Sequence, residues 1–320
     1  MLETLKLVRG SVSTKDLMPV LTHFLLMEGE IRGFNGRMAI TAPAPDLHDI
    51  AVTVPAEPFL RAVDACGANV KLKVTKDGRL EIRGSSLRVT LPTGKTDDFP
   101  LLKPEGKKTK LDFPLLSHFA LLQPFIGDDA SRAWSCGILV KDGACYTTNN
   151  IVLAKTDLGG TFPHLNLPVF VVNELVRIGL EPESIYTAKD SITFMLPSGV
   201  WIRSQLFDAA WPKDPEELLP KVTRKTPLPT GLKEAVERVL PFCPDPHMPI
   251  IYFDGEKVRT AEGQFSAEVT GFDLPAGTYQ GQHLLAVLAA ATSANFKAYP
   301  VVPWHGKGVQ GIIIGIGISK

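Results

Sequence analysis

Gly94-Lys95-Thr96 is the part of this sequence that comes nearest to a phosphate-binding loop. Such a loop needs another glycine five positions earlier and a helix directly afterwards, because its backbone N–H groups must surround the phosphates. The sequence has Val89 at the first place and Asp97-Asp98-Phe99-Pro100 at the second. The segment therefore does not predict nucleotide binding.

The other residues that could do chemistry are scattered. No two histidines stand four residues apart, no C-x-x-C pair occurs, and there is no G-x-S-x-G nucleophile motif. The adjacent carboxylates Asp97-Asp98 and Asp128-Asp129 fall in predicted turns, where solvated side chains are the common case. We therefore expect no catalytic residue, metal or cofactor. The cysteines are expected to be small buried side chains in a reducing compartment: Cys66, Cys136, Cys145 and Cys243.

The composition is that of a soluble globular protein. The chain has 320 residues, of which 44% are hydrophobic and 21% charged, enough for two or three domains. Its 34 basic and 34 acidic residues cancel, which argues against a simple basic DNA-coating protein but permits positive charge on one face. The first residues lack the pattern of a secretory signal, and the longest apolar run, 312–318, is short and broken by glycine. We expect a cytoplasmic protein.

An internal repeat gives the fold. Apolar strands that enclose a turn occur three times, and the turn glycines Gly29, Gly143 and Gly255 lie 114 and 112 residues apart (143 − 29 and 255 − 143). Glycine in such a turn accepts the positive φ that a tight hairpin needs. Helical patterns follow each hairpin, at 54–63, 168–177 and 279–288, and others open each copy, at 2–8, 113–120 and 232–239.

Further strands complete each copy: 70–74, 80–83 and 87–91; then 185–188, 192–196 and 200–206; then 296–302 and 309–318. The prediction is an α+β protein of three tandem domains, each with two helices and seven or eight strands. The expected limits are 1–105, 106–222 and 223–320, joined by linkers at 101–110 and 220–229 that carry Pro, Lys and Arg.

Several segments resemble, in the same order along the chain, the beta sliding clamps of bacterial DNA polymerase III. They are Lys15–Leu21, Thr93–Pro100, Ser204–Pro212 followed by Leu218-Leu219-Pro220, and Gly311–Ile316. The resemblance implies a non-enzymatic processivity factor of three clamp domains, with helices that line a ring and antiparallel sheets outside. It implies a head-to-tail homodimer that encircles double-stranded DNA without reading its sequence. It also implies that short linear peptides attach the polymerase and the clamp loader to the ring.

A ring that slides needs basic and polar side chains on its inner helices, which meet phosphates through diffuse contacts. Carboxylates on the same helices indicate a mixed lining, and any single basic residue could equally be an ordinary solvated side chain. The candidate DNA-facing residues are Lys6, Arg9, Lys15, Arg61, Arg132, Arg177, Lys233 and Arg238.

The resemblance also implies an apolar groove for partner peptides, although the same residues could be interdomain core. Ile151-Val152 stands where the family has His-Arg, which implies a drier groove with a different peptide preference. This departure suggests a distant clamp of bacterial or phage origin. The matching groove residues are Thr148, Asn150, Ile151, Val152, Leu153, Pro212, Leu218, Ile312 and Ile314.

The edges that would join two copies are expected at 80–83 or 87–91 in the first domain and at 296–302 in the third, with the apolar Val301–Trp304 buried there. The alternative interpretation is a β-rich structural or scaffold protein, built by domain triplication and without a DNA role. An enzyme of unknown type ranks third.

Overall fold

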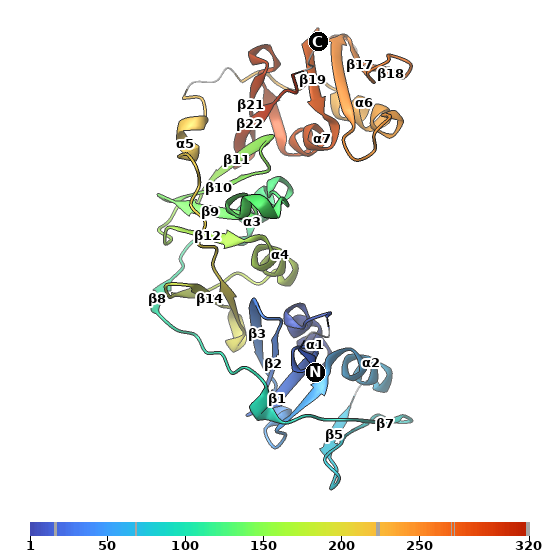
Figure 1. Ribbon diagram of the computed structural model, residues 1–320, viewed down its shortest axis with the longest axis vertical. Helices are drawn as coiled ribbons and strands as arrows, with labels where there is room; N and C mark the ends of the chain where they lie inside the picture. The colour runs from blue at the N-terminus through green and yellow to red at the C-terminus, as the bar shows by residue number, and fades with distance from the viewer. Residues whose placement is uncertain (16–17, 68, 222–224, 270, 272, 318–320) are drawn as a thin grey trace. The chain divides into compact units, whose positions relative to one another are not determined.

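Helices and strands follow one another in the same order three times along the chain (Figure 1). The computed structural model describes residues 1–320 except 16–17, 68, 222–224, 270, 272 and 318–320. Each copy has an opening helix, three strands, a fourth strand that leads into a second helix, and three further strands, and the second copy has one extra strand, β8. This order confirms the predicted α+β triplication.

The elements of the first copy are α1 (Leu2–Val8), β1 (His23–Met27), β2 (Glu30–Phe34), β3 (Met38–Pro43), β4 (Val52–Pro55), α2 (Ala56–Cys66), β5 (Lys71–Val74), β6 (Leu80–Arg83) and β7 (Arg88–Leu91). Those of the second are β8 (Lys107–Lys110), α3 (Leu116–Leu122), β9 (Gly137–Lys141), β10 (Ala144–Thr148), β11 (Val152–Asp157), β12 (Leu165–Pro168), α4 (Val169–Ile178), β13 (Ser184–Thr187), β14 (Ser191–Met195) and β15 (Trp201–Gln205).

After α5 (Pro215–Leu218), the third copy has α6 (Leu232–Val239), β16 (Ile250–Gly255), β17 (Lys257–Arg259), β18 (Ser266–Glu268), β19 (Leu274–Gln280), α7 (Gly281–Ala290), β20 (Ala291–Ala294), β21 (Val301–Gly306) and β22 (Gln310–Ile314). Short 3-10 turns lie between them, at Arg9–Ser11, Pro19–Thr22, Pro45–Leu47, Thr96–Asp98, Gln123–Phe125, Ala130–Ser135, Pro197–Gly199, Leu240–Phe242 and Phe296–Ala298.

The hairpins form where the sequence places them. In the β1–β2 turn Glu28 and Gly29 have φ of 57° and 72°, and in the β9–β10 turn Asp142 and Gly143 have φ of 50° and 75°. Two consecutive left-handed residues match the right-handed twist of the strands that they join.

The helices bury one apolar face, and α6 shows this pattern most clearly because its other face is charged. In α6 the buried side chains Leu232, Ala235, Val236 and Val239 recur at helical spacing, so this stripe is held against the third-copy sheet. α6 also packs against α7, as α1 does against α2 (Figure 1).

Within the described residues the strands form four antiparallel sheets. Eight strands follow the order β4-β1-β2-β3-β15-β14-β13-β8, and seven follow β12-β9-β10-β11-β22-β21-β20. Each of these sheets therefore joins strands of two successive copies. The other two sheets, β18-β17-β16-β19 and β5-β6-β7, hold strands of one copy only.

The chain divides into two compact units, residues 1–112 with 174–206, and residues 113–173 with 207–320. The predicted limits of three domains divide the chain differently and stay a prediction. Three of the four cysteines are buried, and Cys136 is partly exposed. No helix of the described part is long and apolar enough to cross a membrane.

Two sequence predictions are wrong in detail. The expected strand at 296–302 begins as a 3-10 turn at Phe296–Ala298, and the strand lies before it at β20. The apolar Phe296 packs in the core against Phe253 and Tyr279, so its presence does not indicate a strand. The predicted linker at 101–110 contains β8, which pairs with β13.

The third copy contains a glycine pattern that is also found in dinucleotide-binding proteins. Gly306, Gly308 and Gly311 have G-x-G-x-x-G spacing, but they lie in the β21–β22 hairpin. A dinucleotide site needs this pattern between a strand and a helix, so the hairpin gives no such site.

Candidate functional site

An apolar cavity of about 390 Å³ lies in the second unit, beside the turn between β10 and β11. All nine predicted groove residues line it. The structure adds four residues that the sequence analysis did not select: Trp134, Trp211, Lys213 and Val301. Trp211 directly precedes Pro212 in the segment Ser204–Pro212 that carries the family resemblance, so the sequence could have indicated it. Nothing in the sequence distinguishes Trp134.

The turn beside the cavity is held by side-chain hydrogen bonds. The Asn149 Oδ1 atom accepts from the backbone N–H groups of Ile151 (3.1 Å) and Val152 (2.8 Å). The Thr148 hydroxyl accepts from Asn150 N–H (3.0 Å) and donates to the Val152 carbonyl oxygen (2.7 Å). Asn150 adopts a left-handed φ of 72°, which asparagine tolerates. The backbone that carries Ile151 and Val152 is therefore fixed.

β22 supplies the adjoining wall. Leu153 pairs with Ile312 across β11 and β22, and Val301 pairs with Ile314 across β21 and β22. The Ile314 N–H group donates to the Ile151 carbonyl oxygen at 2.8 Å. This part of the cavity belongs to a continuous hydrogen-bonded sheet.

Large apolar side chains remain exposed around the cavity. Leu218, Val301 and Ile314 are 46%, 42% and 41% exposed. Trp134 and Trp211 meet edge to face, with ring centroids 5.3 Å apart. Clustered exposed apolar groups around a hollow are typical of a surface that binds a partner. Among the described residues, Lys213 is the one titratable side chain in the lining, so the cavity suits apolar groups and not acid–base chemistry.

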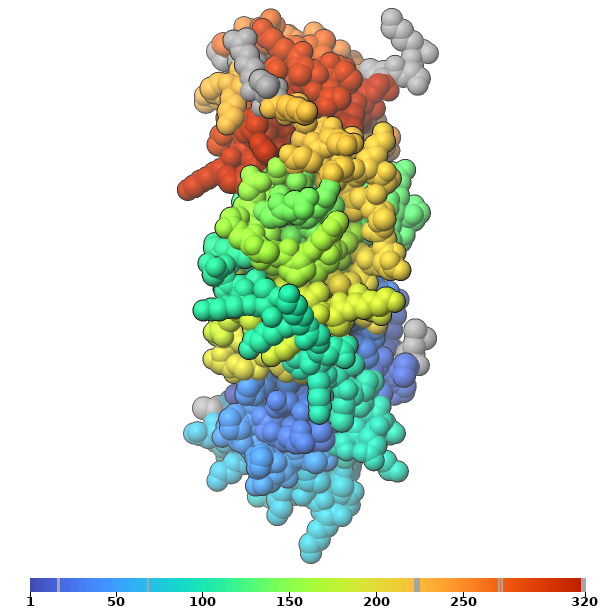
Figure 2. Space-filling model, turned by 90° about the vertical axis from the view of Figure 1, so that its left-hand side faces the viewer, coloured from blue at the N-terminus to red at the C-terminus, as the bar shows by residue number. Residues whose placement is uncertain are grey.

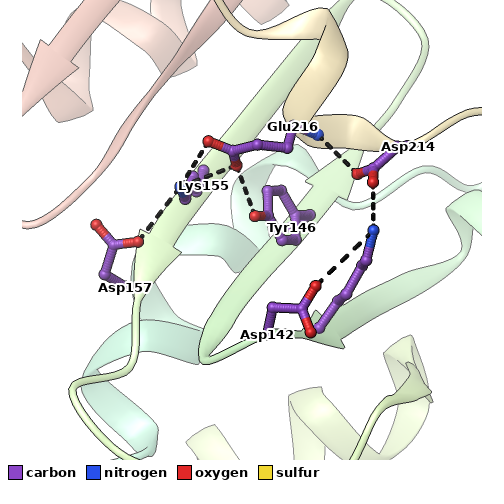
Figure 3. A network of polar contacts seen from close by, with 7 residues as sticks. Asp142, Tyr146, Lys155, Asp157, Asp214 and Glu216 are labelled. Carbon is purple, nitrogen blue, oxygen red and sulfur yellow. Dashed lines mark hydrogen bonds and ion pairs between the residues drawn. The ribbon is translucent and has the colours of Figure 1, made fainter. Parts of the chain in front are cut away.

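Trp134 and four residues of 207–219, namely Trp211, Pro212, Lys213 and Leu218, complete the lining. Polar contacts attach residues 207–219, called the α5 segment below, to the strands (Figure 3). Glu216 accepts a hydrogen bond from the Tyr146 hydroxyl (2.7 Å) and pairs with the Lys155 ammonium (2.9 Å). Asp214 caps α5 by accepting from Glu216 N–H (3.1 Å), and it also pairs with Lys141.

These contacts shift the ionisation of the groups involved. The hydrogen bond from Tyr146 and the pairing with Lys155 lower the pKa of Glu216. The contact with Lys141 lowers the pKa of Asp214. Burial would lower the pKa of Lys155, but the hydrogen bond to Glu216 and the nearby carboxylates outweigh it and raise that pKa. All three groups are therefore charged at neutral pH.

The fold of the whole chain is similar to that of several solved structures. No protein-family model matches the sequence, and no curated protein matches it. The sliding clamp of Bartonella birtlesii bound to griselimycin superposes with a TM-score of 0.81 at 18% identity, over 99% of this chain and 97% of that one. The Pseudomonas aeruginosa clamp bound to griselimycin gives 0.80 at 20%, and the Bacillus subtilis DNA polymerase sliding clamp gives 0.79 at 16%, each with the same coverage.

The chain has the fold of the bacterial sliding clamps. The match spans all three copies of the repeat, so it does not rest on one common α+β motif.

In this clamp fold the predicted DNA-facing residues lie on helices or adjoining loops and are at least partly exposed. Five of the eight have a carboxylate partner: Lys6 with Glu3 (3.0 Å), Arg9 with Glu57 (2.7 Å), Arg132 with Asp129 (3.6 Å), Arg177 with Glu174, and Lys233 with Glu237 (3.6 Å). Lys15, Arg61 and Arg238 form no ion pair among the described residues. Which of the eight face DNA stays a prediction.

The clamp fold also has strand edges without a neighbour. Within the described residues β7 is the last strand of one sheet and β18 of another. Next to β18, Phe242 and Phe265 stack with ring centroids 4.4 Å apart, and 52% and 43% of these residues are exposed. They line a cleft of about 530 Å³ together with Glu234 and Arg238 of α6. β21, the expected edge in the third copy, instead pairs with strands on both sides.

Proposed function

We propose that this protein is a DNA sliding clamp that works as a tether and not as a catalyst. Two copies join head to tail into a ring around duplex DNA, in the cytoplasm. Short linear peptides of a polymerase and of a clamp loader bind in the cavity beside the β10–β11 turn.

The observation that carries this proposal is the coincidence of fold and cavity. Nine residues selected by resemblance, from separate segments between Thr148 and Ile314, line one apolar hollow in a chain with the clamp fold. Burial of one or two apolar anchors there, at roughly 25 cal/mol per Å², gives enough free energy for a weak, exchangeable tether.

The repeat itself supports a head-to-tail ring. Ile40, Ala154 and Ser266 occupy equivalent places, because each stands 11 residues after the turn glycine of its own copy (40 − 29, 154 − 143 and 266 − 255). Ile40 pairs with Ile202 in the first large sheet, and Ala154 pairs with Gly311 in the second. Ser266, in the edge strand β18, has no such partner among the described residues.

The missing partner is Val89 in β7 of a second copy. Within its own sheet, Val89 pairs with Ile82 of the middle strand β6, and Ile82 pairs with Leu72, the second residue of β5. In the same way, Ile202 pairs with Phe194 of β14, and Phe194 pairs with Ile185, the second residue of β13. By this equivalence β7 continues the β18 sheet of the next copy, with Val89 opposite Ser266. Two such contacts close a ring with twofold symmetry.

A cysteine pair tests this register. Residues directly opposite in an antiparallel pair are close enough for a disulfide. We expect Val89→Cys/Ser266→Cys to give a covalent dimer on mild oxidation, whereas Lys73→Cys/Ser266→Cys should not. A monomeric wild type at micromolar concentration would contradict the ring itself. A dimer that cross-links equally in both variants would contradict only the register.

The DNA contact is proposed to be diffuse. The locally paired charges on the helices reduce tight phosphate binding, and a closed ring needs no such binding to remain on DNA. The test is retention on a closed DNA circle and loss when the circle is cut.

A further inference from the structure

The two sides of the candidate peptide cavity are held in different ways. Ile151, Leu153, Ile312 and Ile314 belong to the β11–β22 sheet or to its turn. The α5 segment contributes Trp211, Pro212, Lys213 and Leu218, and none of its residues belongs to a strand of the described chain. Its position therefore depends on side-chain contacts, because it has no backbone ladder to fix it.

Apolar contacts hold the start and the end of this segment. Phe207 meets Phe170 edge to face, with ring centroids 6.4 Å apart. Trp211 and Leu219 pack on a small cluster of buried side chains, namely Leu139, Ala144 and Tyr146. Figure 2 shows the segment (gold) lying against the strands of the second copy (light green). In the middle of the segment Pro215 is buried, and the polar contacts of α5 attach it to the strands.

Glu216 is where these polar contacts meet. Its carboxylate takes both the Tyr146 hydroxyl of β10 and the Lys155 ammonium of β11, so that one side chain ties α5 to two neighbouring strands (Figure 3). Lys155 also lies over the Tyr146 ring, 5.6 Å from its centroid, and Asp157 lies 3.4 Å from the ammonium.

Burial of Lys155 makes the loss of its partner more costly than in an ordinary surface ion pair. The Lys155 side chain is only 12% exposed, whereas Glu216 is 56% exposed. Loss of the Glu216 charge would leave a largely buried ammonium with the more distant Asp157 alone. The resulting cost in free energy is reduced if α5 moves away and water reaches Lys155.

We propose that Glu216 is a positioning residue that holds the α5 segment in place and so sets the width of the peptide cavity. Glu216 does not line that cavity, and its effect passes through Trp211, Pro212 and Leu218. The inference rests on the proposed peptide-binding function. If the protein binds peptide only while the α5 segment is packed against the strands, the apparent Kd is inversely proportional to the fraction of molecules in that arrangement.

The test measures peptide binding and segment mobility in the full-length protein. The probe is a capped, fluorescein-labelled hexapeptide with Leu and Phe anchors and no charged side chain. For Glu216→Gln we expect Kd to rise by about three- to tenfold, the range for loss of a partly exposed charge-assisted hydrogen bond. Hydrogen exchange of residues 207–219 should become faster. Glu217→Gln, on the same helix, removes an exposed carboxylate that forms no ion pair in the described chain, and it should change neither quantity.

A second variant separates positioning from a general loss of stability. Glu216→Gln/Lys155→Met removes the buried ammonium together with its charged partner, and the amide oxygen of the substituted side chain can still accept the Tyr146 hydrogen bond. We expect this double variant to recover at least half of the lost affinity, measured as the logarithm of Kd. An unchanged Kd in Glu216→Gln, or equal effects in Glu217→Gln, would overturn the proposal.

The two levels of inference fail in different ways. If the wild type binds no peptide while Glu216→Gln still speeds exchange across 207–219, the peptide function is wrong and the docking role of Glu216 stands. If the wild type binds peptide and Glu216→Gln leaves both readouts unchanged, the docking role is wrong and the peptide function stands.

Discussion

Leu218 gives the sharpest prediction about the cavity. It lies in the α5 segment, lines the cavity and is 46% exposed in the free protein. A bound apolar anchor would cover that exposed part. Because full burial of a leucine side chain contributes about 1.5–3 kcal/mol, burial of the remaining half contributes about 0.7–1.4 kcal/mol.

Leu218→Ala removes most of this contribution. We therefore expect the Kd of an apolar peptide to rise by about three- to tenfold. The stability of the free protein should change little, because the side chain is already half solvated. Fluorescence polarisation of a labelled peptide measures the affinity, and denaturant unfolding measures the stability.

Leu180→Ala is the matched control. Leu180 is 38% exposed and lies outside the cavity, so the same atoms are lost from a similar environment. An unchanged Kd in Leu218→Ala, or an equal rise in Leu180→Ala, would refute the assignment of the cavity.

Three further predictions concern the edges and the polar network. Phe265→Asp places a charge opposite the second copy, and sedimentation should show a dimer dissociation constant at least about tenfold higher, while an unchanged constant would refute this edge. Arg177 of α4 donates a hydrogen bond to the Leu7 carbonyl oxygen of α1, and by equivalence Asp64 of α2 should face Arg238 of α6 in the second copy. Asp64→Arg or Arg238→Asp should weaken the dimer, and the double exchange should restore it. A double exchange that fails to restore the dimer would contradict this contact. The pKa of Glu216 is lowered from its ordinary value of 4.5, so its contribution to the stability of the fold is present above pH 4.5 and is lost as the pH falls through the pKa in the folded protein. The difference in stability between wild type and Glu216→Gln should therefore shrink in acid, as measured by unfolding titrations.

The sequence predicts the fold well because the repeat makes three weak signals support one another. The hairpin turns and the amphipathic helices recur at nearly constant spacing, and each needs only local chemistry. The groove residues could be selected because the resemblance carries positions from distant segments. Trp134 was missed because it reaches the cavity through a 3-10 turn, and no local pattern marks that approach.

The errors also have local causes. β8 has exposed lysines at three of its four positions, so its sequence resembles a charged linker, although its backbone pairs with β13. β20, Ala291–Ala294, has no large apolar side chain, so the sequence pattern favours a strand in the more apolar 296–302. The polar network of Glu216 was not predicted, because its partners Tyr146 and Lys155 are more than 60 residues away and meet it only in the folded chain.

Retention on DNA tests the central claim most directly. The protein is loaded onto a nicked circular plasmid with its clamp loader, or by assembly of the ring around it, and unbound protein is removed by gel filtration. A sliding clamp should remain with the circle, and it should leave when a restriction enzyme linearises the plasmid, because its hold is topological. Protein that stays on linear DNA as long as on the circle, or that never remains on the circle although it is dimeric, would contradict the account.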